Sequence, residues 1–187
     1  MLFAHGSGSS RHSPRNRYVA SVLHQGGLAT LLLDLLTAAE EQADLKSGNL
    51  RFDIGLLGDR LVEATDWLQR EPATRSFPIG YFGASTGAAA ALVAAAELPS
   101  LIRAVVSRGG RPDLAGSLLS KVNAPTLLIA GSKDAPVIGL NRLALAELRC
   151  EKRLSIVPGA THLFEEPGTL EEVSKLARNW FRHHVRS

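Results

Sequence analysis

Hydrophobic residues occur along the chain in short continuous runs that alternate with longer stretches of helical periodicity. Because each run is apolar throughout, and not only at alternate positions, we expect strands that are covered on both faces. The sequence therefore predicts a parallel sheet between two layers of helices. The expected strands are Leu2–Ala4, Ala29–Leu33, Ile79–Phe82, Ile102–Ser107, Thr126–Ala130 and Arg153–Val157.

Between these runs, apolar residues recur at the spacing of one helical face, as Leu57, Leu61 and Leu68 do. The expected helices are Arg15–Gln25, Phe52–Arg70, Ser85–Glu97, Gly139–Leu148 and Leu170–His184. Thr169, followed three residues later by Glu172, predicts a capping box at the start of the last helix. Residues 35–50 are polar and charged and are expected to form a loop. Strands alternating with helices predict an α/β fold with right-handed crossovers, in one domain over residues 1–187.

Composition narrows the class of protein. Hydrophobic residues make up 45% of the 187 residues and charged residues 21%, which is a globular composition. The lone Cys150 cannot form an internal disulfide, which excludes a disulfide-stabilised secreted scaffold. The net charge of +3 comes without a dense Lys/Arg run, so nucleic acid is not an expected partner. The most apolar stretch, residues 87–96, is shorter than the roughly 20 residues of a spanning helix, and no signal peptide is evident. We therefore expect a soluble cytoplasmic protein without a membrane partner.

The segment Gly83-Ala84-Ser85-Thr86-Gly87 follows an apolar run and leads directly into an alanine-rich helix. This is the G-x-S-x-G pattern of a nucleophile elbow, in its required context of strand, turn and helix. The turn would present the Ser85 hydroxyl above the sheet. The backbone N–H of Thr86 would point to the place where negative charge develops. A small-residue turn with an incidental serine is the alternative.

A serine nucleophile needs a histidine base and a carboxylate that orients it. His162 lies in a loop before the last helix, and Asp134 follows the preceding strand. The order Ser, Asp, His places all three candidates at the carboxyl ends of strands, where open α/β sheets collect their reactive groups. Asp113, after the strand at 102–107, is the competing candidate for the acid. We favour the triad Ser85, Asp134 and His162.

With these motifs the chain resembles the α/β-hydrolases, and more narrowly the dienelactone-hydrolase-like group. The resemblance implies that the segment beginning at His5 and Gly6 carries the second oxyanion N–H, from Ser7, with Gly8 as the neighbouring candidate. It also implies a minimal form of the fold, with about six parallel strands, helices on both faces, no lid domain, and the family's first strands missing. Dienelactone hydrolase itself uses a cysteine, so a serine at position 85 favours ordinary carboxylic esters.

The expected function is that of a serine carboxylesterase acting on short-chain esters without a cofactor or metal ion. Only residues 107–123 separate two strands where relatives insert a lid, so we expect an open acyl pocket built from residues 7–11, 108–113 and 135–139. The expected partner is a small ester, and the protein is expected to be a monomer or a homodimer. Alternatives are a non-hydrolytic binding module, a lactone or thioester hydrolase, and an acyltransferase that uses the same triad.

Overall fold

The six strands form one parallel sheet in a computed structural model that describes residues 1–185. Its strand order is β2-β1-β3-β4-β5-β6, so the chain starts in the strand next to one edge, adds that edge with β2, and then builds toward the other edge. The strands are β1 (Leu2–Ala4), β2 (Leu31–Leu32), β3 (Ile79–Ala84), β4 (Ile102–Arg108), β5 (Thr126–Gly131) and β6 (Lys152–Val157). All five neighbouring pairs are parallel, as the continuous apolar runs predicted.

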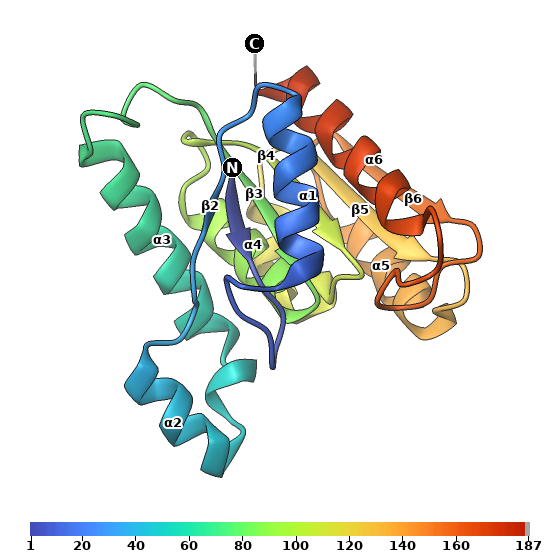
Figure 1. The fold of residues 1–187 in the computed structure, drawn as a ribbon, viewed down its shortest axis with the longest axis horizontal. Helices are drawn as coiled ribbons and strands as arrows, with labels where there is room; N and C mark the ends of the chain where they lie inside the picture. Colours follow the sequence, from blue (N-terminus) through green and yellow to red (C-terminus); the bar gives the residue numbers. More distant parts are fainter. Residues whose placement is uncertain (186–187) are drawn as a thin grey trace.

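Helices cover both faces of this sheet. They are α1 (Pro14–Gln25), α2 (Ala38–Ser47), α3 (Ile54–Arg70), α4 (Thr86–Glu97), α5 (Ala135–Glu147) and α6 (Thr169–His184), with short 3-10 helices η1 (Leu50–Phe52) and η2 (Pro112–Lys121). Figure 1 shows α1 and α6 side by side across one face. Buried residues of α3, α4, α5 and η2 pack with the opposite face. The predicted α/β-hydrolase architecture with helices on both faces is confirmed.

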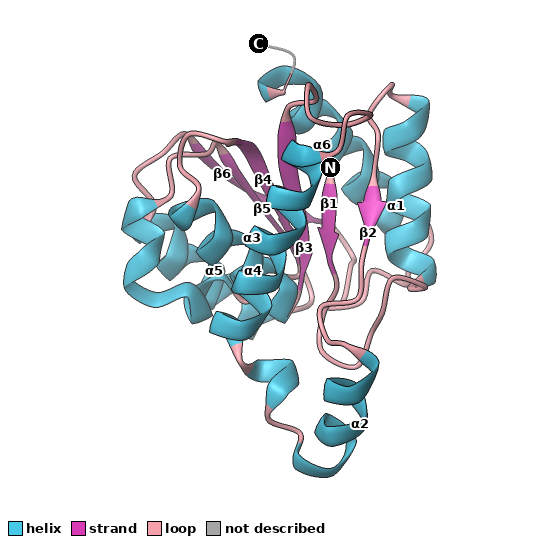
Figure 2. Ribbon diagram, turned by 90° about the vertical axis from the view of Figure 1, so that its left-hand side faces the viewer, coloured by secondary structure: helices cyan, strands magenta, loops and turns pink. Residues whose placement is uncertain are grey.

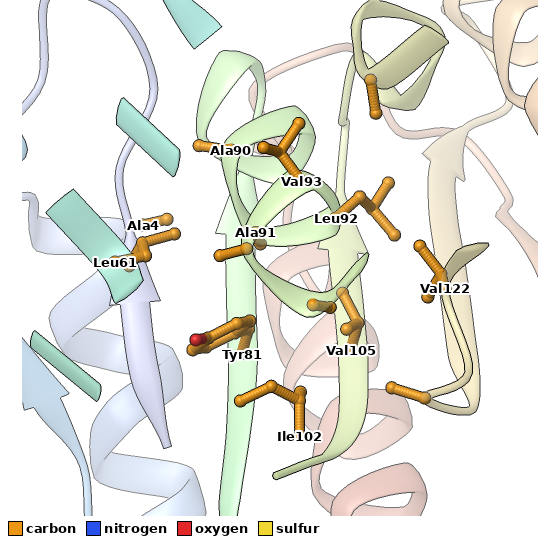
Figure 3. Packing of buried hydrophobic residues seen from close by; sticks show 14 of the residues in the cluster. Ala4, Leu61, Tyr81, Ala90, Ala91, Leu92, Val93, Ile102, Val105 and Val122 are labelled. Carbon is orange, nitrogen blue, oxygen red and sulfur yellow. The ribbon is translucent and has the colours of Figure 1, made fainter. Parts of the chain in front are cut away.

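The two hydrophobic clusters lie on opposite faces of the sheet. On the α4 face, helix α4 is buried along nearly its whole length because alanines let it approach the strands closely, as Figure 3 shows. Tyr81 reaches from β3 into this layer and shares a 2.7 Å hydrogen bond with the hydroxyl of Thr65 on α3. That bond satisfies two hydroxyls that are both shielded from water. On the other face, Phe3 and Phe82 stack against each other beneath α1 and α6.

The segment expected to be a loop, residues 35–50, contains helix α2 instead. Together α2 and η1, residues 38–52, form a small projection that we call the cap. Figure 2 shows the cap beyond the carboxyl ends of β1 and β2, away from the helices that cover the sheet. The connection between β4 and β5 is short, as expected, and carries only η2. Within residues 1–185, no helix is both long enough and apolar enough to cross a membrane.

Candidate active site

Ser85 lies in a strained turn between β3 and α4. Its φ and ψ angles are 51° and −123°, a conformation that non-glycine residues seldom adopt outside functional sites. The end of β4 and the loop after it hold this turn through the backbone, because Ser85 N donates to Arg108 O (3.3 Å) and Arg111 N donates to Ser85 O (3.1 Å). The strain at Ser85 is therefore maintained by a neighbouring loop whose role is not evident from sequence.

Two glycines make this turn possible. A Cβ atom at Gly87 would lie 2.3 Å from the carbonyl oxygen of Ala4, and one at Gly83 would lie 2.4 Å from the Cα of Ala88. Both separations are far below van der Waals contact, and the two neighbouring atoms belong to the backbone and cannot turn aside. The two outer glycines of the G-x-S-x-G segment are thus required by the close approach of strand β1, strand β3 and helix α4.

The structure pairs His162 with Asp134. The Nδ1 atom of His162 is 2.7 Å from Asp134 Oδ2, and both side chains are partly shielded from solvent. Asp113 is instead held by Arg111 in a two-point ion pair, with distances of 2.9 Å and 2.8 Å. Of the two candidate acids, Asp134 is therefore the one that contacts the histidine.

The histidine loop and the elbow meet at Gly109. This glycine has a φ angle of 51°, and a Cβ atom on it would lie 3.0 Å from the backbone oxygen of His162 and 3.7 Å from its ring carbon Cε1. Its neighbour Arg108 supplies the carbonyl that accepts from Ser85 N. The three candidate residues thus converge at one end of the sheet. Among residues 1–185, His162 Nδ1 is hydrogen-bonded to Asp134, and no hydrogen bond joins His162 to the hydroxyl of Ser85.

The segment after β1 packs against the other side of the elbow. A Cβ atom at Gly6 would be 2.9 Å from the Cβ of Ser85, so this backbone passes directly beside the serine. The N–H of Ser7 donates to Thr86 Oγ1 at 2.9 Å. Ser7, the predicted oxyanion donor, thus lies beside the elbow, and in this structure its N–H is bound to the side chain of Thr86.

His5 fixes this segment in position. Its Nε2 accepts a hydrogen bond from Leu35 N (3.1 Å), so that nitrogen carries no proton, while Nδ1 is 2.9 Å from Gly6 O. The pair of contacts defines a neutral imidazole protonated at Nδ1. His5 thereby ties the backbone next to Ser85 to the end of β2, which is a structural role and not a proton-transfer role.

A cavity of about 200 Å³ lies between this segment and the cap. Gly6, Ser7 and Thr86 line one end, and residues of α2, η1 and the turn after β2 line the other. The expectation that residues 7–11 contribute to a pocket agrees with this cavity in part, since Ser7 to Ser10 line it. Residues 108–113 and 135–139 do not line it. The cap supplies the wall that was expected to be absent, because residues 35–50 fold as a helix.

The cap is attached by ion pairs. Arg51 binds the carboxylate of Asp44 through its side chain and its backbone N–H, and Arg60 on α3 binds Glu40 on α2 at 2.9 Å. Asp44 is 3% exposed. Burial alone would raise the pKa of Asp44, but the hydrogen bonds and charge of Arg51 outweigh it and lower that pKa. The buried carboxylate therefore stays ionised and holds η1 against α2.

Arg108 is a buried charge close to the elbow. Its side chain is 8% exposed, and burial together with the nearby Arg15 lowers the pKa of Arg108 to about 10. Asn16 Oδ1, at 3.5 Å from Nη2, is a distant partner. The guanidinium remains charged at neutral pH and fixes β4 against the first turn of α1. Over residues 1–185, no three His, Cys, Asp or Glu side chains gather as ligands of a metal ion.

Solved structures share this fold. A crystal structure of dienelactone hydrolase from Anabaena variabilis superimposes with a TM-score of 0.97 and 65% sequence identity, over 99% of this chain and 86% of that one. Est1E from Butyrivibrio proteoclasticus has the same fold, with a TM-score of 0.81 and 15% identity over 100% of this chain and 88% of that one.

A protein of Mycobacterium tuberculosis, named "Putative phosphoribosyl transferase", is 61% identical over 185 residues. The chain spans 99% of its own length in that match but only 41% of the curated relative. Residues 37–184 match the dienelactone hydrolase family, which is most of the sequence. The chain therefore belongs to the dienelactone hydrolase family.

Proposed function

We propose that the chain is a serine carboxylesterase that hydrolyses short-chain carboxylic esters. The observation that carries this proposal is the strained Ser85, held at the N-terminus of α4 at the corner where the His162–Asp134 pair meets the elbow. A serine in this turn has no structural need for a histidine–carboxylate pair nearby. Nucleophilic catalysis, by contrast, requires all three groups.

In the proposed reaction, Ser85 Oγ attacks the ester carbonyl carbon and its proton passes to Nε2 of His162. Asp134 accepts from Nδ1–H, keeps the ring in the correct tautomer and stabilises the imidazolium. The imidazolium then returns the proton to the departing alcohol oxygen as the C–O bond breaks, which leaves an acyl-enzyme. Water, deprotonated by the same histidine, then attacks the acyl carbon. The bond from that carbon to Ser85 Oγ breaks, the carboxylic acid leaves, and the imidazolium returns the proton to Ser85 Oγ. The N–H groups of Thr86 and Ser7 are proposed to stabilise the oxyanion in both steps.

The test is covalent labelling together with turnover. A fluorophosphonate probe should label the wild-type chain, and Ser85→Ala should abolish labelling and reduce hydrolysis of nitrophenyl butyrate by several orders of magnitude. Ser21→Ala on α1, which removes a hydroxyl that donates to Tyr18 O away from the elbow, is the matched control and should keep both. Labelling that persists in Ser85→Ala would exclude Ser85 as the nucleophile.

The alternatives make different predictions in the same assays. A non-hydrolytic binding module with this fold would not react with the probe. A lactone or thioester hydrolase would react with it but prefer those substrates to esters in competition. An acyltransferase would release more ester than acid when an alcohol is added. The transferase name of the mycobacterial relative was given to a protein more than twice as long, so it does not specify the activity of this part.

A further inference from the structure

The cavity under the cap shares part of its lining with a second hollow. The inner cavity, about 200 Å³, contacts Gly6, Ser7 and Thr86 beside the elbow. The outer groove, about 360 Å³, is lined by Ser7, Gly8 and residues 44–52 of the cap. The two share Ser7, Gly8, Asp44, Leu45 and Arg51, and Leu45 is the one apolar side chain in that shared set.

The size of the inner cavity limits what it can hold. Pockets for drug-sized ligands usually measure about 300–1,000 Å³, so this one suits a group of only a few carbon atoms. Its floor is apolar, because Leu35 and Leu57 line it and both side chains are almost fully buried. A small apolar group would therefore be removed from water here, whereas a longer chain would have to pass Leu45.

Leu45 lines both hollows without being packed into the core. Its side chain is 68% exposed, and Phe52, farther along the outer groove, is 56% exposed. Both apolar side chains are thus available to a ligand, and neither is needed to bury other parts of the fold. Truncating Leu45 would open the inner cavity toward the outer groove at little cost in stability.

One of the carboxylates that line the cavity has no cationic partner among residues 1–185. Three carboxylates line it, but Asp34 is paired with Arg11 at 2.9 Å and Asp44 is held by Arg51. The third, Glu41 on α2, makes no ion pair or side-chain hydrogen bond with any of residues 1–185. Its negative charge is therefore not neutralised, and a second carboxylate brought into the cavity would be repelled.

We infer that this cavity is the acyl pocket, that it takes a short uncharged acyl group, and that two residues of the cap set this specificity. Leu45 limits the length of the acyl chain, and Glu41 disfavours acyl groups that carry a carboxylate. The inference rests on the proposed esterase function, since it assigns the acyl side of an ester attacked by Ser85.

The length assignment is tested with nitrophenyl butyrate and hexanoate, below the concentration at which either aggregates. In Leu45→Ala, the ratio of kcat/KM for hexanoate to that for butyrate should rise about tenfold, because two more methylenes can be buried at about 0.8 kcal/mol each. Leu143→Ala is the matched control, because Leu143 is 67% exposed on α5 and lines neither hollow. A ratio that stays the same in Leu45→Ala would overturn the assignment of length.

The charge assignment uses the nitrophenyl monoester of succinate, which has the acyl length of butyrate and an added carboxylate. The wild-type chain should prefer butyrate, and Glu41→Gln should reduce that preference about tenfold, whereas Glu147→Gln on α5 should not. An unchanged preference would overturn the role of Glu41. If the wild-type chain hydrolyses none of these esters, the esterase function fails and the pocket assignment with it. Hydrolysis with unaltered ratios overturns the pocket assignment alone.

Discussion

Removing the hydroxyl of Thr86 tests whether the oxyanion site depends on a side chain next to the nucleophile. Ser7 N donates to Thr86 Oγ1 at 2.9 Å, and Thr86 is 4% exposed. The substitution Thr86→Val keeps the shape of the side chain and removes the acceptor. Ser7 N–H is then left without its partner, beside two glycines, Gly6 and Gly8, that do little to restrain the backbone.

Two effects of opposite sign follow from this geometry, and their magnitudes decide between them. If the bond to Thr86 merely competes with the oxyanion, its loss gains at most the net value of one hydrogen bond, about 0.5–1.5 kcal/mol, or up to roughly tenfold in rate. If the bond aligns Ser7 N–H, its loss removes much of one oxyanion donor, which is worth about 10²–10³-fold in kcat. The second effect is larger, so we expect kcat to fall by about 10–100-fold with little change in KM.

The assay is hydrolysis of nitrophenyl butyrate by three variants. Thr86→Ser restores the hydroxyl and should return most of the activity, which separates the hydrogen bond from packing. Thr30→Val is the control, because it removes a hydroxyl that also makes a hydrogen bond, to His24 at 3.2 Å, away from the elbow. A Thr86→Val variant as fast as the wild type, or faster, would refute the aligning role and support simple competition.

Two further predictions concern the acid and the cap. Asp134→Asn should lower kcat by about 10⁴-fold, since it removes the group that holds the histidine tautomer. Asp113→Asn should keep most of the activity, and comparable losses in both variants would contradict the pairing of His162 with Asp134. The pKa of Asp44 is lowered in the folded chain, so its ion pair stabilises the cap above about pH 4, where the carboxyl of the unfolded chain is ionised. This stabilisation is lost at lower pH, as acid protonates the folded side chain. In Arg51→Gln, burial should raise the pKa of Asp44. Protection of residues 38–52 from hydrogen exchange, corrected for intrinsic rates, should therefore be lost at a higher pH than in the wild type. Loss at the same pH would argue against a stabilising Asp44–Arg51 ion pair.

The sheet and the elbow could be predicted because their signals are local and redundant. Runs such as residues 79–84 and 126–131 are apolar without interruption. An uninterrupted apolar run of this length is typical of a strand that is buried on both faces. The choice between Asp134 and Asp113 could not be made this way. Each follows a strand of the same sheet, and the distinction comes from contacts in the structure, where Asp134 contacts His162 and Asp113 is paired with Arg111. The backbone bonds that join residues 108–111 to Ser85 are likewise long-range contacts without a side-chain signature.

The cap was missed for a different reason, which two similar segments illustrate. Both Thr37–Glu40 and Thr169–Glu172 have the spacing of a capping box, yet the box forms at the first and not at the second. Thr37 is extended, so its hydroxyl accepts from Glu40 N and the Glu40 carboxylate accepts from Thr37 N.

At the second segment, Gly168 takes a left-handed conformation with a φ angle of 80° and serves as the cap residue. Thr169 is thereby already the first residue of α6, and its hydroxyl donates to Glu166 O instead. The spacing of the motif alone thus does not determine where the helix begins. Here the left-handed conformation of Gly168, the residue before the threonine, determines it. For residues 38–47 the apolar periodicity is weak, because Leu45 is the one large apolar side chain. Helix α2 is therefore stabilised by local polar features and not by hydrophobic burial: the first capping box, the left-handed Gly48 and the Asp44–Arg51 ion pair. Its one leucine, Leu45, remains exposed.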